Sequence, residues 1–105
     1  GQLVFILQRG VRFPQGPPLM KYFIYLLINI KNNRATTYVG YTNDLKKRLI
    51  AHNSSKGAKF TRGRKWTLIY KRCYKIKSSA MKNEYLLKND RIKRYEIKQK
   101  YLDKL

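Results

Sequence analysis

The chain of 105 residues contains a single cysteine, Cys73, and a single histidine, His52. Zinc fingers, zinc ribbons and disulfide frameworks all require several such residues, so this pair excludes them. Cys73 lies in an apolar run that is typical of a strand, and we expect a buried thiol rather than a reactive one. A lone free thiol is compatible with a reducing compartment.

Acidic residues are also scarce, with five Asp and Glu against 25 Lys and Arg and a formal net charge of +20. A compact domain with this charge repels itself unless polyanions are near, so nucleic acid is the partner that the composition favours. No apolar run approaches the ~20 residues of a membrane span, and a membrane partner is not expected. A ribosomal or RNA-coating protein is the less specific interpretation of the same charge.

Residues 1–19 carry no acid and no regular period, and a Gly-Pro-Pro stretch lies just before Met20. We interpret them as a leader, disordered or irregular, ahead of a native start at Met20, with a targeting peptide as the alternative. The expected domain is therefore a single unit of residues 20–105, whose core is just sufficient for its size.

The apolar pattern predicts three strands. Residues 21–30 form a nearly continuous apolar run and are expected to be a buried central strand. Residues 36–41 resume the β pattern after a turn, which indicates an antiparallel hairpin whose ladder ends at Gly40. Residues 66–76, rich in aromatic and branched side chains, predict the third strand.

Helical signals lie between and after these strands. Residues 45–53 follow three N-cap residues that include Asp44, and a second helix is expected to begin at Ser78 or Ser79. In the last stretch Ile92, Tyr95, Tyr101 and Leu102 recur at near-helical spacing, which suggests a third helix closing over the sheet. The order β-β-α-β-α-α predicts an α+β domain, a small three-stranded, mostly antiparallel sheet flanked by helices.

The segment 53–65 contains two glycines, no acid and five cations, and we expect a basic surface loop. Such a loop binds nucleic acid by neutralising phosphates, irrespective of sequence. The residues expected to make these contacts are Lys56, Lys59, Arg62, Arg64 and Lys65.

Glu84 is the one carboxylate of the five that has no obvious structural role. The other four are expected to cap a helix or to reduce local positive charge: Asp44, Asp90, Glu96 and Asp103. Glu84 lies on or beside the apolar stripe of its helix, so it must pair with a cation, bind a metal ion or change its protonation. A surface ion pair with Lys88, four residues on, explains its position equally well.

Arg48 and His52 lie one helical turn apart on the face that carries Leu45 and Leu49, so both should point toward the sheet. A guanidinium group among apolar residues requires an anion, either Glu84 or a phosphate. A packed and hydrogen-bonded histidine is a simpler interpretation of His52 than a catalytic one.

Tyr25 and Tyr38 fall on adjacent strands, where paired aromatic residues are ordinary packing. Taken with Arg48, His52 and Glu84, however, they form a set that suits phosphodiester hydrolysis. A metal ion held by the acid polarises the phosphate, the arginine balances developing charge, and a phenol or imidazole removes the proton of water.

With these residues the chain resembles the GIY-YIG nuclease superfamily, and in particular its small stand-alone single-domain endonucleases. Phe23-Ile24-Tyr25 and Tyr38-Val39-Gly40 stand where the two name-giving triplets belong. The stretch NDLKKRLIAHN resembles the arginine-bearing helix of that superfamily, and SAMKNEYLLK resembles the helix whose glutamate binds the metal ion.

The resemblance implies a divalent-metal-dependent endonuclease acting on DNA, with structure-specific cleavage in repair or recombination as the narrower expectation. It places Tyr25 and Tyr38 at the reaction centre, Arg48 on the scissile phosphate or leaving group, and Glu84 as the ligand of Mg²⁺ or Mn²⁺. His52 matches a position near the nucleophile, and either His52 or a tyrosine is the general base. A non-catalytic, basic DNA- or RNA-binding module is the alternative function.

Further expectations concern the proton acceptor, the partners and the location of the protein. Tyr41 stands where the excision-repair branch has a lysine that could favour the phenolate form of a tyrosine. Its absence favours His52 as the proton acceptor. We expect a monomer or homodimer acting on DNA, with RNA as a second substrate class and a separate targeting protein as a partner. The expected location is the cytoplasm or the nucleoid, with an organelle or a virus-infected cell as alternatives.

Overall fold

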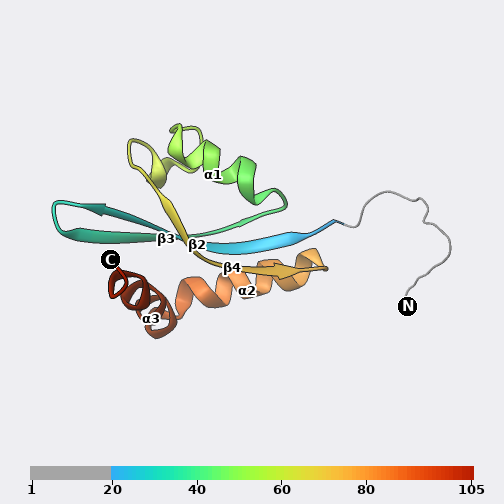
Figure 1. Ribbon diagram of the computed structural model, residues 1–105. Helices are drawn as coiled ribbons and strands as arrows, with labels where there is room; N and C mark the ends of the chain where they lie inside the picture. The colour runs from blue at the N-terminus through green and yellow to red at the C-terminus, as the bar shows by residue number, and fades with distance from the viewer. Residues whose placement is uncertain (1–19) are drawn as a thin grey trace, which may run out of the picture.

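Three strands and three helices build the part of the chain that the computed structural model describes, residues 20–105 (Figure 1). The expectations for residues 1–19 lie outside the described residues. The elements, in chain order, are β2 (Tyr22–Lys31), β3 (Arg34–Thr42), α1 (Leu45–Asn53), the 3-10 helix η1 (Lys59–Thr61), β4 (Thr67–Tyr74), α2 (Lys77–Asn89) and α3 (Arg91–Leu102). The predicted order β-β-α-β-α-α is confirmed.

The apolar run of β2 forms the centre of the sheet, whose strand order is β3-β2-β4 with both pairs antiparallel. Six consecutive residues, Ile24 to Asn29, are buried, because helices cover both faces of this strand. The continuous run, which does not alternate, reflects this two-sided burial.

A two-residue turn joins β2 to β3. Asn32 and Asn33 have φ angles of 54° and 61°, the left-handed values that a tight hairpin turn requires and that asparagine tolerates. The ladder then runs through Gly40 as far as Thr42, which pairs with Phe23. The prediction that Gly40 ends the ladder is therefore wrong.

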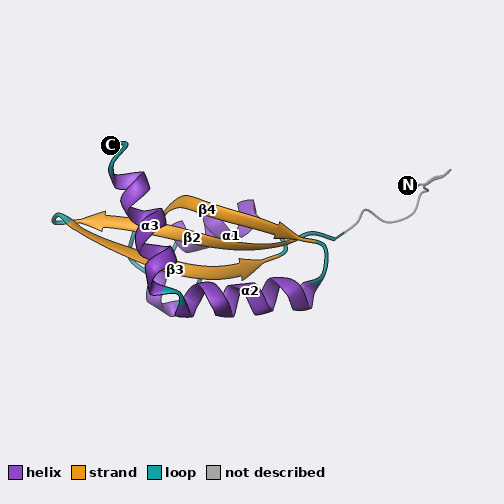
Figure 2. Ribbon diagram, turned by 90° about the horizontal axis from the view of Figure 1, so that it is seen from below, coloured by secondary structure: helices purple, strands orange, loops and turns teal. Residues whose placement is uncertain are grey.

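The sheet separates two hydrophobic clusters. Tyr25, Leu27 and Trp66 pack under α1 on one face, together with Leu45 and Leu49. The opposite face packs against α2 and α3, where the buried cluster comprises Ile24, Leu26, Val39, Ala80 and Leu87. Seen from that side, α3 crosses the strands while α2 runs beside β3 (Figure 2).

The N-terminus of one of the three helices, α1, is capped by the residue that the sequence predicted. Asp44 caps α1 by accepting a hydrogen bond from the backbone nitrogen of Lys47 at 3.1 Å. The second helix begins earlier than predicted, after Ile76, and has no side-chain cap. Asp90, expected only to reduce positive charge, caps α3 through the backbone nitrogen of Lys93 at 2.9 Å.

Three exposed side chains differ from the sequence-based expectation. Cys73, on the edge strand β4, is exposed. Ile92 and Tyr95 are 74% and 59% exposed, and it is Ile97 that packs α3 against the core instead. Within residues 20–105, no helix is both long and apolar enough to cross a membrane.

Candidate active site

Tyr25 and Gly40 face each other across the β2–β3 ladder. A Cβ atom at Gly40 would overlap the Cζ atom and the hydroxyl oxygen of Tyr25, which is 1% exposed. Gly40 is not among the residues with positive φ, so its backbone does not require glycine. The glycine of the second triplet is needed here for space, because the phenol of the first triplet lies over it.

A chain of three hydrogen bonds starts at this phenol. The hydroxyl of Tyr25 lies 2.8 Å from Nε2 of His52, and Nδ1 of His52 lies 2.8 Å from Oγ1 of Thr61. The Thr61 hydroxyl in turn donates to the carbonyl of Ala58 at 2.8 Å. The chain thus connects the central strand, α1 and η1.

These contacts define the tautomer of His52. Thr61 has one hydroxyl proton and donates it to Ala58, so Thr61 can only accept from His52. Nδ1 of His52 therefore carries the proton, and in the neutral imidazole Nε2 is an acceptor. It follows that the phenol of Tyr25 donates its proton toward Nε2 of His52.

The imidazole is fully enclosed. His52 and Thr61 are both 0% exposed, and a Cβ atom at Gly57 would lie 2.5 Å from Nδ1 of His52. Burial, reinforced by the charge of Arg48, lowers the pKa of His52 below its ordinary value of 6.5. The neutral form, which can accept a proton at Nε2, therefore predominates at neutral pH.

Arg48 contacts the same phenol from α1. Its interaction with Tyr25 raises the pKa of the guanidinium group, and burial raises the pKa of Tyr25 although Arg48 opposes that rise. The Nε atom of Arg48 is buried and has no hydrogen-bond partner among residues 20–105. A buried donor without a partner is costly.

Tyr38 lies on the same face as Tyr25 and joins an aromatic group. Its ring meets the His52 ring edge-on, with 5.3 Å between the ring centroids. The same ring stacks on Phe60, with 6.1 Å between the centroids and 18° between the ring planes. Phe60 is 51% exposed, and the guanidinium carbon of Arg64 lies 5.0 Å from its ring centroid. The aromatic group therefore links the buried hydrogen bonds to the surface.

Glu84 comes from α2, which packs against β2 and β3 from the opposite face. Its side chain is 24% exposed, and a carboxylate oxygen lies 3.9 Å from the amine of Lys88. Its charge also contributes to the raised pKa of Tyr25, which indicates that it lies within electrostatic reach of the phenol. The ion pair expected from the i, i+4 spacing is present, and the carboxylate still faces solvent in part.

A metal ion at Glu84 would have at most two ligands from His, Cys, Asp or Glu side chains, because no group of three or more of them gathers in residues 20–105. Zn²⁺ prefers several nitrogen or sulfur ligands, so this arrangement does not suit it. Mg²⁺ is commonly bound through one or two carboxylates, with water and substrate phosphates completing its shell. The chemistry of Glu84 therefore fits the expected Mg²⁺ or Mn²⁺.

The predicted basic loop is closed by Asn53, whose side chain accepts from the backbone nitrogen of Trp66 at 2.6 Å and donates to its carbonyl at 3.1 Å. All five of its cations are exposed, namely Lys56, Lys59, Arg62, Arg64 and Lys65. Arg62 and Arg64 share a cavity of about 500 Å³ with Lys31 and Arg34 of the hairpin. The loop is thus basic and accessible, as predicted.

Thr61 and Gly57 are the site residues that the sequence did not reveal. Both lie in the segment predicted to be an exposed loop, yet Thr61 is completely buried. The indole nitrogen of Trp66 donates to the carbonyl of Thr61 at 2.9 Å and so draws η1 inward. Hydrophobic periodicity carries no signal for a contact of this kind.

The chain is similar to several known proteins. Residues 21–99 match the GIY-YIG catalytic domain. A UPF0213 protein of Bacillus pumilus is 47% identical over 68 residues, which are 64% of this chain and 66% of that relative. A UPF0213 protein of Staphylococcus epidermidis is 42% identical over 69 residues, 65% of this chain and 80% of that relative. The solution structure of a UPF0213 protein from Bacillus halodurans has 34% identity and a TM-score of 0.44, and the match covers 76% of this chain and 84% of that one. The chain belongs to the GIY-YIG catalytic domain family.

Proposed function

We propose that this protein is a divalent-metal-dependent endonuclease that hydrolyses phosphodiester bonds of DNA. The observation that carries the proposal is the buried hydrogen-bond chain from Tyr25 through His52 to Thr61, with Arg48 beside it. Packing alone does not require a phenol, an imidazole and a guanidinium group to meet at one point. Membership of the GIY-YIG family supports the same conclusion.

In this proposal Tyr25 and His52 remove the proton of the attacking water together. The phenol oxygen accepts the proton from water while its own proton moves to Nε2 of His52, so the phenolate, which burial disfavours, does not accumulate. Thr61 keeps the other proton on Nδ1 and leaves Nε2 free to accept. The general base is thus a pair rather than either residue alone.

The remaining residues act on the phosphate. The guanidinium group of Arg48 donates to a non-bridging or leaving oxygen and stabilises the charge that develops there. Tyr38 holds the His52 ring edge-on and forms the wall toward Phe60. Glu84 would hold the divalent cation, which when bound supplies electrophilic assistance to the phosphate.

Cleavage assays test this proposal directly. Purified protein with Mg²⁺ or Mn²⁺ is incubated with linear, nicked, flapped and four-way DNA and with RNA, which also reveals whether cleavage depends on substrate structure. Tyr25→Phe and Glu84→Gln should each abolish cleavage. Glu96→Gln is the matched control, because Glu96 lines a different cavity between β4 and α3.

Two outcomes would contradict the proposal. Cleavage that survives Glu84→Gln would remove Glu84 as the metal ligand. A protein that binds these nucleic acids but cuts none of them under any metal condition would instead be a binding module, for which the exposed cations of the loop are sufficient.

A further inference from the structure

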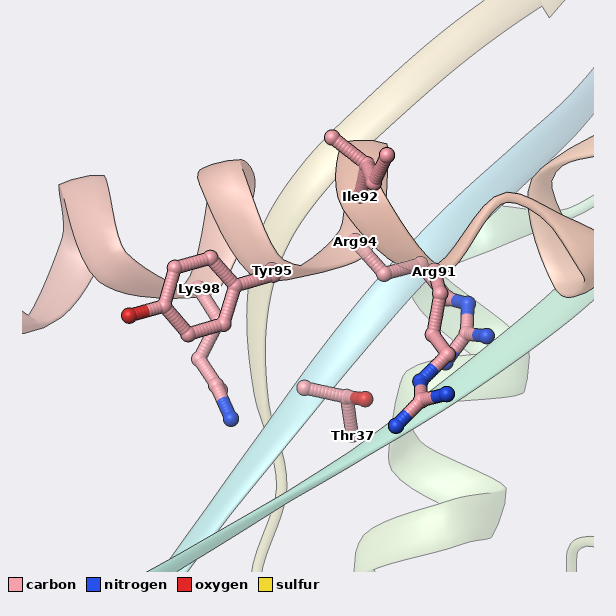
Figure 3. A pocket seen from close by; sticks show the side chains of 6 residues that line it. All are labelled: Thr37, Arg91, Ile92, Arg94, Tyr95 and Lys98. Atoms are coloured by element: carbon pink, nitrogen blue, oxygen red, sulfur yellow. The ribbon is translucent and has the colours of Figure 1, made fainter.

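An open groove of about 690 Å³ separates β3 from the side of α3 that faces it (Figure 3). Its lining consists of Thr37, Arg91, Ile92, Arg94, Tyr95 and Lys98. In the close view Thr37 lies between the amine of Lys98 and the two guanidinium groups. We call this feature the α3 groove.

The α3 groove continues to the candidate active site. A second cavity of about 310 Å³ shares Thr37 and Arg94 with it, and its other lining includes Tyr38 and Phe60. Lys88 also lines this second cavity, and Lys88 is the ion-pair partner of Glu84. A chain of surface hollows therefore leads from the aromatic wall of the site along the edge of the sheet to α3.

The α3 groove is cationic without any acid among its lining residues. The nearby acids are directed elsewhere, because Asp90 caps the helix and Glu96 lines the cavity on the β4 side. Arg94 is held in place, since its Nε donates to the carbonyl of Leu87 at 3.1 Å. Such a surface, with one anchored guanidinium group, complements a run of phosphates.

Tyr95 gives the α3 groove an aromatic surface that the core does not use. The ring is 59% exposed, and the amine of Lys98 lies 5.6 Å from its centroid. An exposed ring beside cations is the arrangement with which proteins pack against the bases and sugars of a nucleic-acid strand. A purely apolar partner would leave three cations of the groove unpaired.

We infer that the α3 groove binds the nucleic-acid strand on one side of the phosphate at the active site, with Arg91, Arg94 and Lys98 on its backbone and Tyr95 against a nucleotide. The inference rests on the proposed function only in taking that phosphate to be the scissile one. Binding by the groove itself requires neither a metal ion nor cleavage.

The test measures binding of fluorescein-labelled single-stranded and duplex DNA by fluorescence anisotropy, in EDTA and over a range of salt concentrations. The variant Arg91→Ala/Lys98→Ala is compared with Lys93→Ala/Lys100→Ala, which removes the same charge from the α3 face that lines the β4 cavity. The groove variant should weaken binding and lower the salt slope by about 0.7 to 0.9 per lost contact. Equal effects of both variants would overturn the inference, because they would mean that DNA is attracted by the overall positive charge and not by the groove.

A second pair of variants tests the ring. Tyr95→Ala should weaken binding of the strand roughly 5- to 100-fold, the usual effect of losing one stacking side chain, while Tyr95→Phe should retain it. Circular dichroism checks that each variant is folded. If Tyr95→Ala binds like the unaltered protein, the inference fails even if DNA is cleaved. If the groove variants lose binding but no DNA is ever cleaved, the proposed function fails and the groove stands.

Discussion

The phenol of Tyr25 lies 2.8 Å from Nε2 of His52, although the two residues are 27 positions apart in the sequence. The contact forms because α1 packs over the face of β2 that carries Tyr25. Since Thr61 occupies the other ring nitrogen, this phenol is the donor. The fold therefore pairs a phenol, which alone is a poor base at neutral pH, with a neutral imidazole that can accept its proton.

Replacing Thr61 tests whether the tautomer matters. Thr61→Val removes the acceptor for Nδ1–H, so the ring proton should move to Nε2 and the phenol of Tyr25 loses its acceptor. We expect kcat to fall roughly 100-fold or more with little change in KM, whereas Thr61→Ser should restore activity. Because the chain contains only one histidine, ¹⁵N NMR of the imidazole reports the tautomer directly.

An unchanged imidazole spectrum in Thr61→Val would contradict this assignment, whatever happens to activity. A loss of activity that Thr61→Ser does not restore would point to a packing defect in η1. Thermal unfolding separates that case, because a packing defect lowers the free energy of unfolding, whereas the change of tautomer leaves no donor of the His52 ring unpaired.

Replacing Gly40 tests the close approach of the two triplets. The new methyl group of Gly40→Ala must displace the buried phenol of Tyr25, so both stability and cleavage should fall. Overpacking of this kind costs about 1–3 kcal/mol, which is measurable by urea unfolding.

The double variant Gly40→Ala/Tyr25→Leu supplies the control. The smaller leucine leaves room for the methyl group, so the double variant should be less destabilised than the sum of the single variants. Strict additivity would show that Gly40 and Tyr25 do not compete for the same space.

The elements that could be predicted from sequence are those with a local cause. The apolar run of β2 predicted a strand buried on both faces, and Asp44 predicted the start of α1. Residues 31–35 predicted a turn, which the positive φ angles of Asn32 and Asn33 confirm. Each of these signals lies within the segment that it shapes.

The features that could not be predicted depend on which element covers which surface. Cys73 is exposed on β4, and Tyr95 is exposed because α3 packs against the core through Ile97. Thr61 is buried because the 3-10 turn folds onto His52. Hydrophobic periodicity does not predict which side chains are covered when the elements pack against one another.

The cations of the loop should control affinity rather than catalysis. Arg62→Ala/Arg64→Ala should weaken DNA binding for all sequences and reduce the salt slope by up to ~0.9 per lost contact on duplex DNA. Lys71→Ala/Arg72→Ala on β4 is the matched control, because these two cations are also exposed. If the loop variant leaves the salt slope unchanged, the loop lies outside the path of the DNA.

The buried imidazole of His52 should make the domain less stable in mild acid. Burial and Arg48 lower its pKa in the folded state below 6.5, so between those two pKa values the unfolded chain binds more protons than the folded one. Stability is therefore greatest above about pH 6.5 and falls as the pH decreases toward the pKa of the folded state. Urea unfolding between about pH 5 and pH 8 should show this loss before the carboxylates titrate.

Cleavage should decline over the same range, because protonated His52 cannot accept the proton of Tyr25. An NMR titration of the single histidine that gave a pKa at or above 6.5 would contradict both expectations, because burial and the charge of Arg48 both disfavour the protonated ring.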